Sequence, residues 1–95
     1  MSHGDIKSAI KDLATRTNQR VGEASWYLFG SSRQGFANAS DIDLVVVCKT
    51  NSIADAIRRT VDVDQLTRPI HLTILTESEE AEMNFVEKRG CIPII

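Results

Sequence analysis

The sequence predicts an α/β fold in which a small mixed β-sheet is flanked by helices. Segments with helical periodicity alternate along the chain with short apolar segments, and this alternation is typical of α/β domains. One apolar segment, residues 42–48, is a continuous Val-rich run. Such a run indicates a strand that is covered on both faces.

Length and composition fit one small domain. The chain has 95 residues, of which 42% are hydrophobic and 25% are charged. These are globular values, which exclude a disordered tail and a disulfide-dense toxin. We therefore expect residues 1–95 to form a single domain. No apolar run approaches the roughly 20 residues that span a bilayer, and the N-terminus lacks the apolar region of a signal peptide. We expect a cytoplasmic protein without a membrane partner.

Net charge and cysteine usage narrow the expected partners. The formal net charge is −2, so no overall basic field attracts nucleic acid, and strong nucleic-acid binding is not expected. Cys48 and Cys91 are isolated and lack metal-type spacing. We predict two buried thiols and no disulfide, which is consistent with a reducing compartment.

The first third of the chain is predicted to hold a helix, a strand and a loop. Apolar residues recur at helical spacing over residues 5–18, which predicts an amphipathic helix. The aromatic-rich segment 25–29 follows Gly22 and is predicted to be a strand. Residues 30–40 are rich in Gly, Ser and Asn and are therefore expected to form a loop.

The central part is predicted to be strand, helix, strand. After the strand at 42–48, residues 52–62 carry an apolar stripe. Residues 50–52 offer N-caps for that helix, and Ser52 with Asp55 resembles a capping box. A third strand is expected at 70–75, directly after a proline.

A final helix is predicted over residues 77–88, with Thr76 and Glu79 as its capping box. Its early residues are acidic and its late residues basic, as the helix dipole favours. Gly90 is the expected C-cap. The apolar residues 92–95 are a candidate edge strand.

Acidic and Gly-Ser residues beside the first two strands suit a metal-bound nucleoside triphosphate. Asp41 and Asp43 are two apart at the start of a strand, so both carboxylates leave the same face. Two such carboxylates repel unless a cation lies between them or one is protonated, and Mg²⁺ is usually held by one or two carboxylates plus substrate phosphates. Gly30 allows close approach of the backbone to a phosphate, to which Ser31 and Ser32 can donate hydrogen bonds.

Each part of this pattern also has a plain structural explanation. A Gly-Ser pair is usually only a turn, and Asp-x-Asp is more often solvated or capping. The combination favours a functional site, because a solvated face would not normally place two acids at the mouth of a buried strand. Arg33 either reaches a phosphate or lies in solvent. Asp62 and Asp64 form a second acidic pair, interpreted as solvated loop residues.

The segment Phe29-Gly30-Ser31, followed by Ser40-Asp41-Ile42-Asp43-Leu44, resembles the signature of the DNA polymerase beta superfamily of nucleotidyltransferases. The short chain resembles the minimal bacterial and archaeal members, which are often the smaller partner of a toxin–antitoxin pair. The resemblance covers nearly the whole chain. It implies a polymerase-beta-like nucleotidyltransferase fold. It also implies Mg²⁺-dependent transfer of a nucleoside monophosphate from a triphosphate, with ATP as the expected donor, to a hydroxyl.

The resemblance also implies roles for individual residues. Asp41 and Asp43 are the predicted metal ligands and catalytic carboxylates. The predicted nucleotide-binding residues are Gly30, Ser31, Ser32 and Arg33.

One position departs from the family pattern. The family usually has a third carboxylate between apolar residues on the next strand, where this chain has Ile70-His71-Leu72. Because His71 shares a strand face with Thr73, opposite the apolar residues, it lies where that carboxylate is expected. A histidine can accept a proton near neutral pH, and as a ligand it suits Mn²⁺ or Zn²⁺ better than Mg²⁺. We predict His71 as a third catalytic residue, with a degenerate site as the equal alternative.

Two hypotheses about function follow. The favoured one is a metal-dependent nucleotidyltransferase, with Mg²⁺ as the cofactor and Mn²⁺ as a substitute. The alternative is a catalytically degenerate module that acts by binding a partner protein, for example as an antitoxin whose helical partner is encoded by a neighbouring gene. The sequence leaves open whether the protein forms a homo-oligomer.

Overall fold

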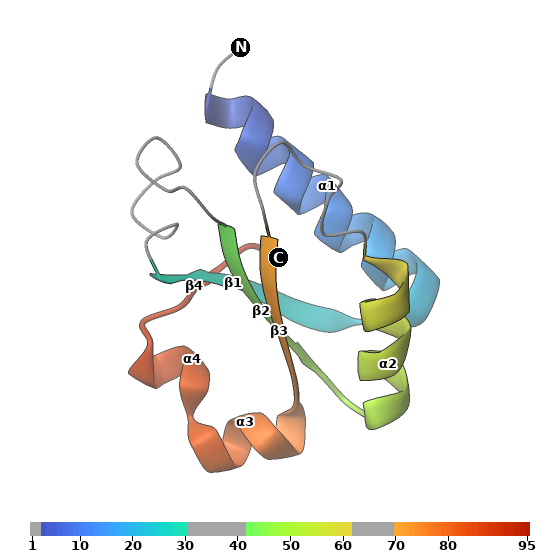
Figure 1. The fold of residues 1–95 in the computed structure, drawn as a ribbon, viewed down its shortest axis with the longest axis vertical. Helices are drawn as coiled ribbons and strands as arrows, with labels where there is room; N and C mark the ends of the chain where they lie inside the picture. Colours follow the sequence, from blue (N-terminus) through green and yellow to red (C-terminus); the bar gives the residue numbers. More distant parts are fainter. Residues whose placement is uncertain (1–2, 31–41, 62–69) are drawn as a thin grey trace.

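The computed structural model describes residues 3–30, 42–61 and 70–95. Helices and strands alternate along them (Figure 1). Their order is α1 (His3–Val21), β1 (Ala24–Phe29), β2 (Ile42–Cys48), α2 (Asn51–Thr60), β3 (Ile70–Thr76), α3 (Glu77–Met83), α4 (Phe85–Lys88) and β4 (Ile92–Pro93). No helix within these ranges is long and apolar enough to cross a membrane.

The four strands form one mixed sheet in the order β3-β2-β1-β4. β1 pairs antiparallel with both β2 and β4, whereas β2 pairs parallel with β3. Parallel neighbours need a crossover connection, and α2 lies in the connection between β2 and β3 (Figure 1). The predicted fold class, a small mixed sheet with flanking helices, is confirmed, and the strand at 42–48 has the predicted bounds.

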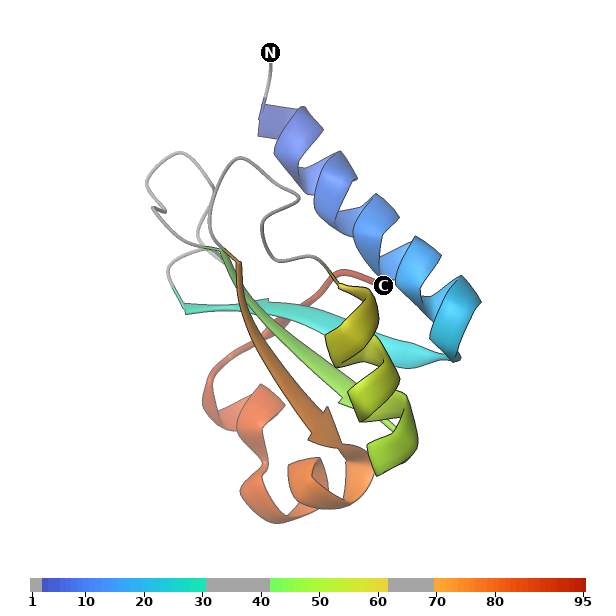
Figure 2. The same cartoon turned by 45° about the vertical axis from the view of Figure 1, so that its right-hand side comes forward.

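Helices α1 and α2 lie together over one face of the sheet (Figure 2), and the main hydrophobic core lies between them and the strands. Trp26 of β1 is fully buried there. Its indole N–H donates to Asn18 Oδ1 at 2.9 Å, and the Asn18 amide donates to the Ala24 carbonyl at 3.0 Å. These bonds join the end of α1 to β1. The rest of the buried cluster is Ile10, Leu13, Ala14, Ile42, Leu44, Val46, Cys48, Ala54, Ile57, Val61 and Ile70.

Helix α1 extends beyond the predicted range 5–18 at both ends. Its last turns contribute contacts that a search for apolar spacing misses, because Asn18 bonds to β1 and Val21 packs against the core. The helix ends before Gly22, which has a φ of 115°.

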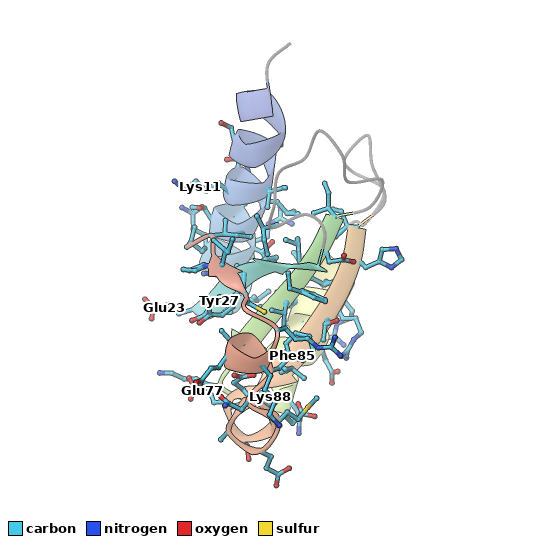
Figure 3. All side chains as sticks on the ribbon, turned by 90° about the vertical axis from the view of Figure 1, so that its left-hand side faces the viewer. Lys11, Glu23, Tyr27, Glu77, Phe85 and Lys88 are labelled. Atoms are coloured by element: carbon cyan, nitrogen blue, oxygen red, sulfur yellow. The ribbon has the colours of Figure 1, made fainter. Side chains whose placement is uncertain are left out.

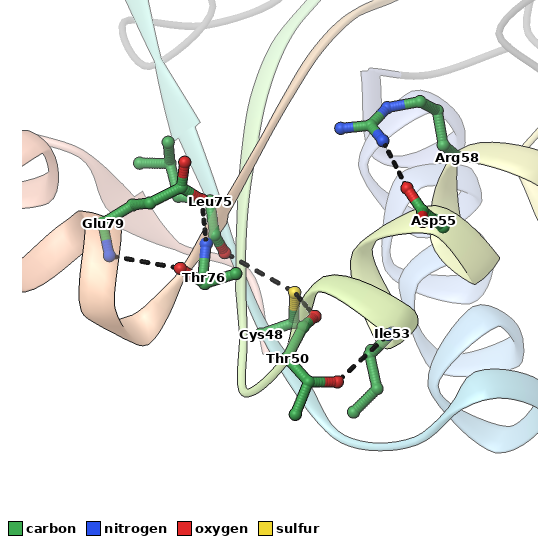
Figure 4. A network of polar contacts seen from close by, with 8 residues as sticks. All are labelled: Cys48, Thr50, Ile53, Asp55, Arg58, Leu75, Thr76 and Glu79. Carbon is green, nitrogen blue, oxygen red and sulfur yellow. Dashed lines mark hydrogen bonds and ion pairs between the residues drawn. The ribbon is translucent and has the colours of Figure 1, made fainter.

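Helix α2 begins one residue earlier than predicted. The Thr50 hydroxyl accepts a hydrogen bond from the backbone N–H of Ile53 at 3.2 Å (Figure 4), so Thr50 is the N-cap. The predicted capping box of Ser52 and Asp55 is therefore wrong. Asp55 instead forms an exposed ion pair with Arg58 at 3.0 Å.

The predicted capping box at the start of α3 is confirmed. The Thr76 N–H donates to Glu79 Oε1 at 2.9 Å, and the Glu79 N–H donates to the Thr76 hydroxyl at 3.2 Å (Figure 4). Both exchanged bonds satisfy backbone donors that the first turn of a helix leaves without partners.

The segment predicted as one helix over 77–88 is two helices. Asn84 interrupts it with φ 50° and ψ 41°, a left-handed conformation that asparagine tolerates better than most residues. The two carboxylate oxygens of Glu80 each accept a hydrogen bond at 3.1 Å, from the N–H groups of Phe85 and Val86. The Glu80 side chain thereby caps the start of α4.

The end of α4 is a Schellman turn. Gly90 has a φ of 61°, its N–H donates to the Glu87 carbonyl at 3.1 Å, and the Cys91 N–H donates to the Val86 carbonyl at 2.9 Å. No disulfide joins Cys48 and Cys91. Cys48 is buried as predicted, but Cys91 lies in this turn and is half-buried, so the prediction of a second buried thiol is wrong.

Candidate active site

Three residues form a row across the sheet, at the end where β1 stops and β2 and β3 start. Phe29 is in register with Asp43, and Asp43 is in register with His71. Residues in register on neighbouring strands project from the same face, with Cα atoms roughly 5 Å apart. The row therefore brings an acidic residue and an imidazole residue together.

This row lies on the face opposite α1 and α2. Along β2 the neighbours of Asp43, Ile42 and Leu44, are fully buried in the main core, whereas Asp43 is half-buried and His71 is exposed. The alternation of a β-strand keeps the carboxylate out of the apolar core without any change in the register of β2.

Gly30 directly follows β1, and the Asp43 carboxylate occupies the space that a side chain at Gly30 would fill. Its φ is 67°, and a Cβ atom at this position would lie 2.5 Å from Asp43 Oδ2 and 3.3 Å from Asp43 Cγ. Real Cβ atoms do not approach other atoms within 3.0 Å. Both the left-handed backbone and the close carboxylate therefore require glycine.

The structure thus brings together three of the residues selected from the sequence, namely Gly30, Asp43 and His71. Four other predicted site residues lie outside the described residues: Ser31, Ser32, Arg33 and Asp41. Asp62 and Asp64 also lie outside them.

The described part of the site offers a donor that fits Mg²⁺. Asp43 supplies hard carboxylate oxygens beside a backbone turn that has no side chain. One or two carboxylates together with substrate phosphates form the usual donor set of protein-bound Mg²⁺. Within residues 3–30, 42–61 and 70–95, no group of three or more His, Cys, Asp and Glu side chains forms a metal site by itself.

An aromatic contact places helix α4 next to the row. The rings of Phe29 and Phe85 meet edge to face, with centroids 5.2 Å apart and planes at 85°. The guanidinium carbon of Arg89 lies 5.6 Å from the centroid of the Phe85 ring. Figure 3 views the molecule from the side of α4 and labels Phe85 and Lys88 on this helix and Tyr27 on β1.

Phe85 and Arg89 were not predicted from the sequence to lie near the site. A continuous helix over 77–88 would direct these side chains differently, so their place depends on the interruption at Asn84. Two residues signalled the interruption. Asn84 is of a type that adopts left-handed backbone, and Glu80, four residues earlier, has a carboxylate that can cap the next helix.

Cys48 lies at the opposite end of β2 and is not part of the row. Burial raises the pKa of its thiol, against the opposing effect of a hydrogen bond to the Thr50 backbone. The sulfur lies 3.5 Å from the Thr50 carbonyl oxygen and 3.6 Å from the Leu75 carbonyl oxygen (Figure 4). Its role is to pack the core, since a thiol with a raised pKa is a poor nucleophile.

The chain was compared with protein families, with curated proteins and with solved structures. A family model described as the nucleotidyltransferase domain matches residues 10–90, a range that contains Gly30, Asp43 and His71. No curated protein and no solved structure matches the chain.

Proposed function

Because the chain belongs to the nucleotidyltransferase domain family, we propose that it is a metal-dependent enzyme. It moves a nucleoside monophosphate from a triphosphate, with ATP as the expected donor, to a hydroxyl acceptor. Family membership supports nucleotidyl transfer in general. The observation that carries the finer proposal is the close approach of the Asp43 carboxylate to the Gly30 turn, because it sets a hard-oxygen metal ligand beside the turn that is proposed to hold the triphosphate.

The reaction assigns separate tasks to the residues of the row. The acceptor oxygen attacks the α-phosphorus, the bond from that phosphorus to the bridging oxygen breaks, and pyrophosphate leaves with the bonding electrons. The Gly30 turn, with Ser31, Ser32 and Arg33, holds the triphosphate. Asp43 and Asp41 hold Mg²⁺, which when bound neutralises charge on the phosphates.

His71 is assigned the proton of the acceptor hydroxyl. It is exposed and lies one strand away from Asp43 on the same face, so a hydroxyl that approaches a phosphate held at Gly30 passes close to the imidazole. A general base needs to be within hydrogen-bond reach of the proton that it removes. If His71 also binds the metal, Mn²⁺ is the better substitute.

One observation favours a second function. The row contains a single carboxylate, Asp43, and an imidazole where a further carboxylate is expected. A site with weakened metal binding can still hold a nucleotide without transferring it. The second candidate is therefore a nucleotide-binding module that acts on a partner protein, for instance as the antitoxin of a helical toxin.

The primary experiment measures label transfer from ATP in the presence of Mg²⁺ and the product of any neighbouring gene. We expect α-phosphate label to be transferred and γ-phosphate label to be released as pyrophosphate. Asp43→Asn should lower transfer about 100-fold or more, whereas the matched control Asp55→Asn should retain it, because Asp55 is an exposed carboxylate on α2. Equal transfer by both variants would contradict the proposed site.

Nucleotide binding separates the two candidates. If the wild type transfers no label but binds Mg²⁺-ATP and Asp43→Asn does not, the module is supported and the enzyme is rejected. If neither transfer nor binding is found, both are rejected.

The role of His71 is tested by two substitutions. His71→Ala should lower transfer strongly, whereas His71→Asp should retain or raise it with Mg²⁺, because a hard-oxygen ligand is restored. Transfer by His71→Ala that equals the wild type would reject His71 as the base and direct attention to Asp62, Asp64 or the partner protein.

A further inference from the structure

The two edges of the sheet differ in how they are protected. β4 forms one edge and consists of only two residues, one of which is Pro93. Short edge strands and prolines are common devices against pairing with another chain. β3 forms the other edge, runs for seven residues and, within the described residues, pairs only with β2.

The β3 edge has none of these devices. The strand Ile70–Thr76 contains no Lys, Arg, Asp, Glu or Pro, and it pairs with β2 in continuous register without a bulge. Four of its seven residues are β-branched, which favours extended pairing. A long, uncharged edge of this kind is a template for another strand.

We propose that β3 pairs antiparallel with β3 of a second copy of this chain, about a two-fold axis at Thr73. The two four-stranded sheets then become one continuous sheet. In this register Leu72 lies opposite the partner's Ile74, and Ile74 lies opposite the partner's Leu72. Both side chains are only partly buried and pack against the main core, so the pairing removes further apolar surface from water.

The charges at the two ends of β3 favour a second copy as the occupant. Helix α2 ends near the start of β3 and carries Arg58 and Arg59 in its last turn, whereas α3 begins at the end of β3 (Figure 2). The glutamates of α3 are Glu77, Glu79, Glu80 and Glu82. Antiparallel pairing sets the start of one β3 beside the end of the other, so each basic helix end approaches an acidic helix of the partner.

The pairing also places the two candidate sites in one assembly. His71 and the partner's His71 would be four residues apart along the paired strands, roughly 13 Å. Both rows would then face the same side of the continuous sheet. An interface of paired edge strands is smaller than the roughly 1,600 Å² of a standard protein interface. We therefore expect a dimer that dissociates in the micromolar range.

Sedimentation velocity over about 5 to 500 µM tests the proposal on the full chain. The wild type should shift from monomer to dimer. Thr73→Lys and Thr73→Asp should each weaken the dimer at least about tenfold, because like charges then lie directly opposite each other, and an equimolar mixture of the two variants should restore it. Thr73→Val retains a β-branched, uncharged side chain and should dimerise. Ile92→Lys, an exposed site on the β4 edge, should also dimerise.

Several results would overturn the proposal. The proposal is wrong if the wild type stays monomeric throughout this range, or if the mixture of charged variants fails to restore the dimer. It is also wrong if Ile92→Lys prevents dimer formation and Thr73→Lys does not. Circular dichroism checks that the charged variants are folded. If they are not, hydrogen exchange of the wild type decides, because β3 amides should exchange more slowly as the concentration rises. Unchanged exchange would reject the pairing.

Discussion

The two faces of the sheet place different demands on residues that are neighbours in the sequence. On the face under α1 and α2, Leu44 and Val46 are fully buried. On the other face Asp43 is half-buried and lies against the Gly30 turn. One residue step along β2 therefore separates a side chain that stabilises the fold from one that is proposed to act on a nucleotide. Stability and function should be separable by substitutions at adjacent positions.

The largest expected effect on stability is on the core face. Leu44→Ala should lower the free energy of unfolding by about 2 to 5 kcal/mol, because a fully buried leucine leaves a cavity. Asp43→Asn retains the shape and most of the hydrogen-bonding capacity of the side chain, so it should change the free energy of unfolding by less than about 1 kcal/mol without metal. Urea unfolding followed by circular dichroism measures both. Equal losses would show that Asp43 has a structural role.

The largest expected effect on function is on the other face. Asp43→Asn should lower kcat/KM for nucleotidyl transfer about 100-fold or more, since a neutral amide no longer balances a bound cation. Leu44→Ala should retain transfer at temperatures at which it is folded. Comparable loss by both variants, measured on folded protein, would remove the contrast between the faces.

Alanine substitutions at two glycines, one at the candidate site and one remote from it, test the comparison further. Gly30 and Gly22 both have positive φ, at 67° and 115°, so an alanine at either position strains the backbone, at a cost of about 1 to 2 kcal/mol. Only at Gly30 does the new Cβ collide with Asp43; at Gly22 the nearest contact is Ile53 Cδ1 at 3.8 Å. Gly30→Ala should therefore lose Mg²⁺-nucleotide binding in titration calorimetry, whereas Gly22→Ala should retain it.

A smaller effect on stability is expected at Asn84, the turn between α3 and α4. Asn84→Ala should destabilise the protein by about 1 kcal/mol, because alanine is strained in left-handed backbone. Asn84→Gly should stay within about 0.5 kcal/mol of the wild type. Thermal melts compare the two variants. Equal stability of both would show that the turn adopts another conformation in solution.

The smallest effect is a pH dependence within the core. Burial raises the pKa of Cys48 above its ordinary value of 9.0, so the unfolded chain releases this proton first as the pH rises. The contribution of the protonated Cys48 thiol to the free energy of unfolding is fully present below about pH 9 and is lost progressively above it. Cys48→Ala should therefore lose less stability between pH 8 and pH 10 than Cys91→Ala, as denaturant midpoints would show. An identical decline would show that the Cys48 thiol does not contribute.

The parts of the structure that depend on strand alternation could be predicted from the sequence. The bounds of β2 and the shared face of Asp43 and His71 follow from a period of two, and the proximity of Gly30 to Asp43 follows from the spacing of the motif. The interruption at Asn84 was not predicted, because the asparagine and Glu80 signal it only weakly and both are also compatible with a continuous helix. The capping contact from Glu80 that stabilises the break forms only in the folded turn.

The start of α2 and the contact of Phe29 with Phe85 also could not be predicted from local sequence. Thr50 and Ser52 are both suitable N-caps, and only the point where β2 ends decides between them. The contact of Phe29 with Phe85 joins segments more than fifty residues apart in the sequence. No local pattern could have placed Arg89 beside this contact.

Trp26 is the single tryptophan of the chain, and its surroundings give the protein an intrinsic optical reporter. Its side chain bonds to Asn18 of α1, while its backbone carbonyl accepts a hydrogen bond at 2.8 Å from the N–H of Ile94. The indole therefore lies where the first helix, the first strand and the last residues meet. Its emission should be blue-shifted in the folded protein and move to longer wavelength when any of these three segments detaches. One fluorescence signal would then follow both ends of the chain without an added label.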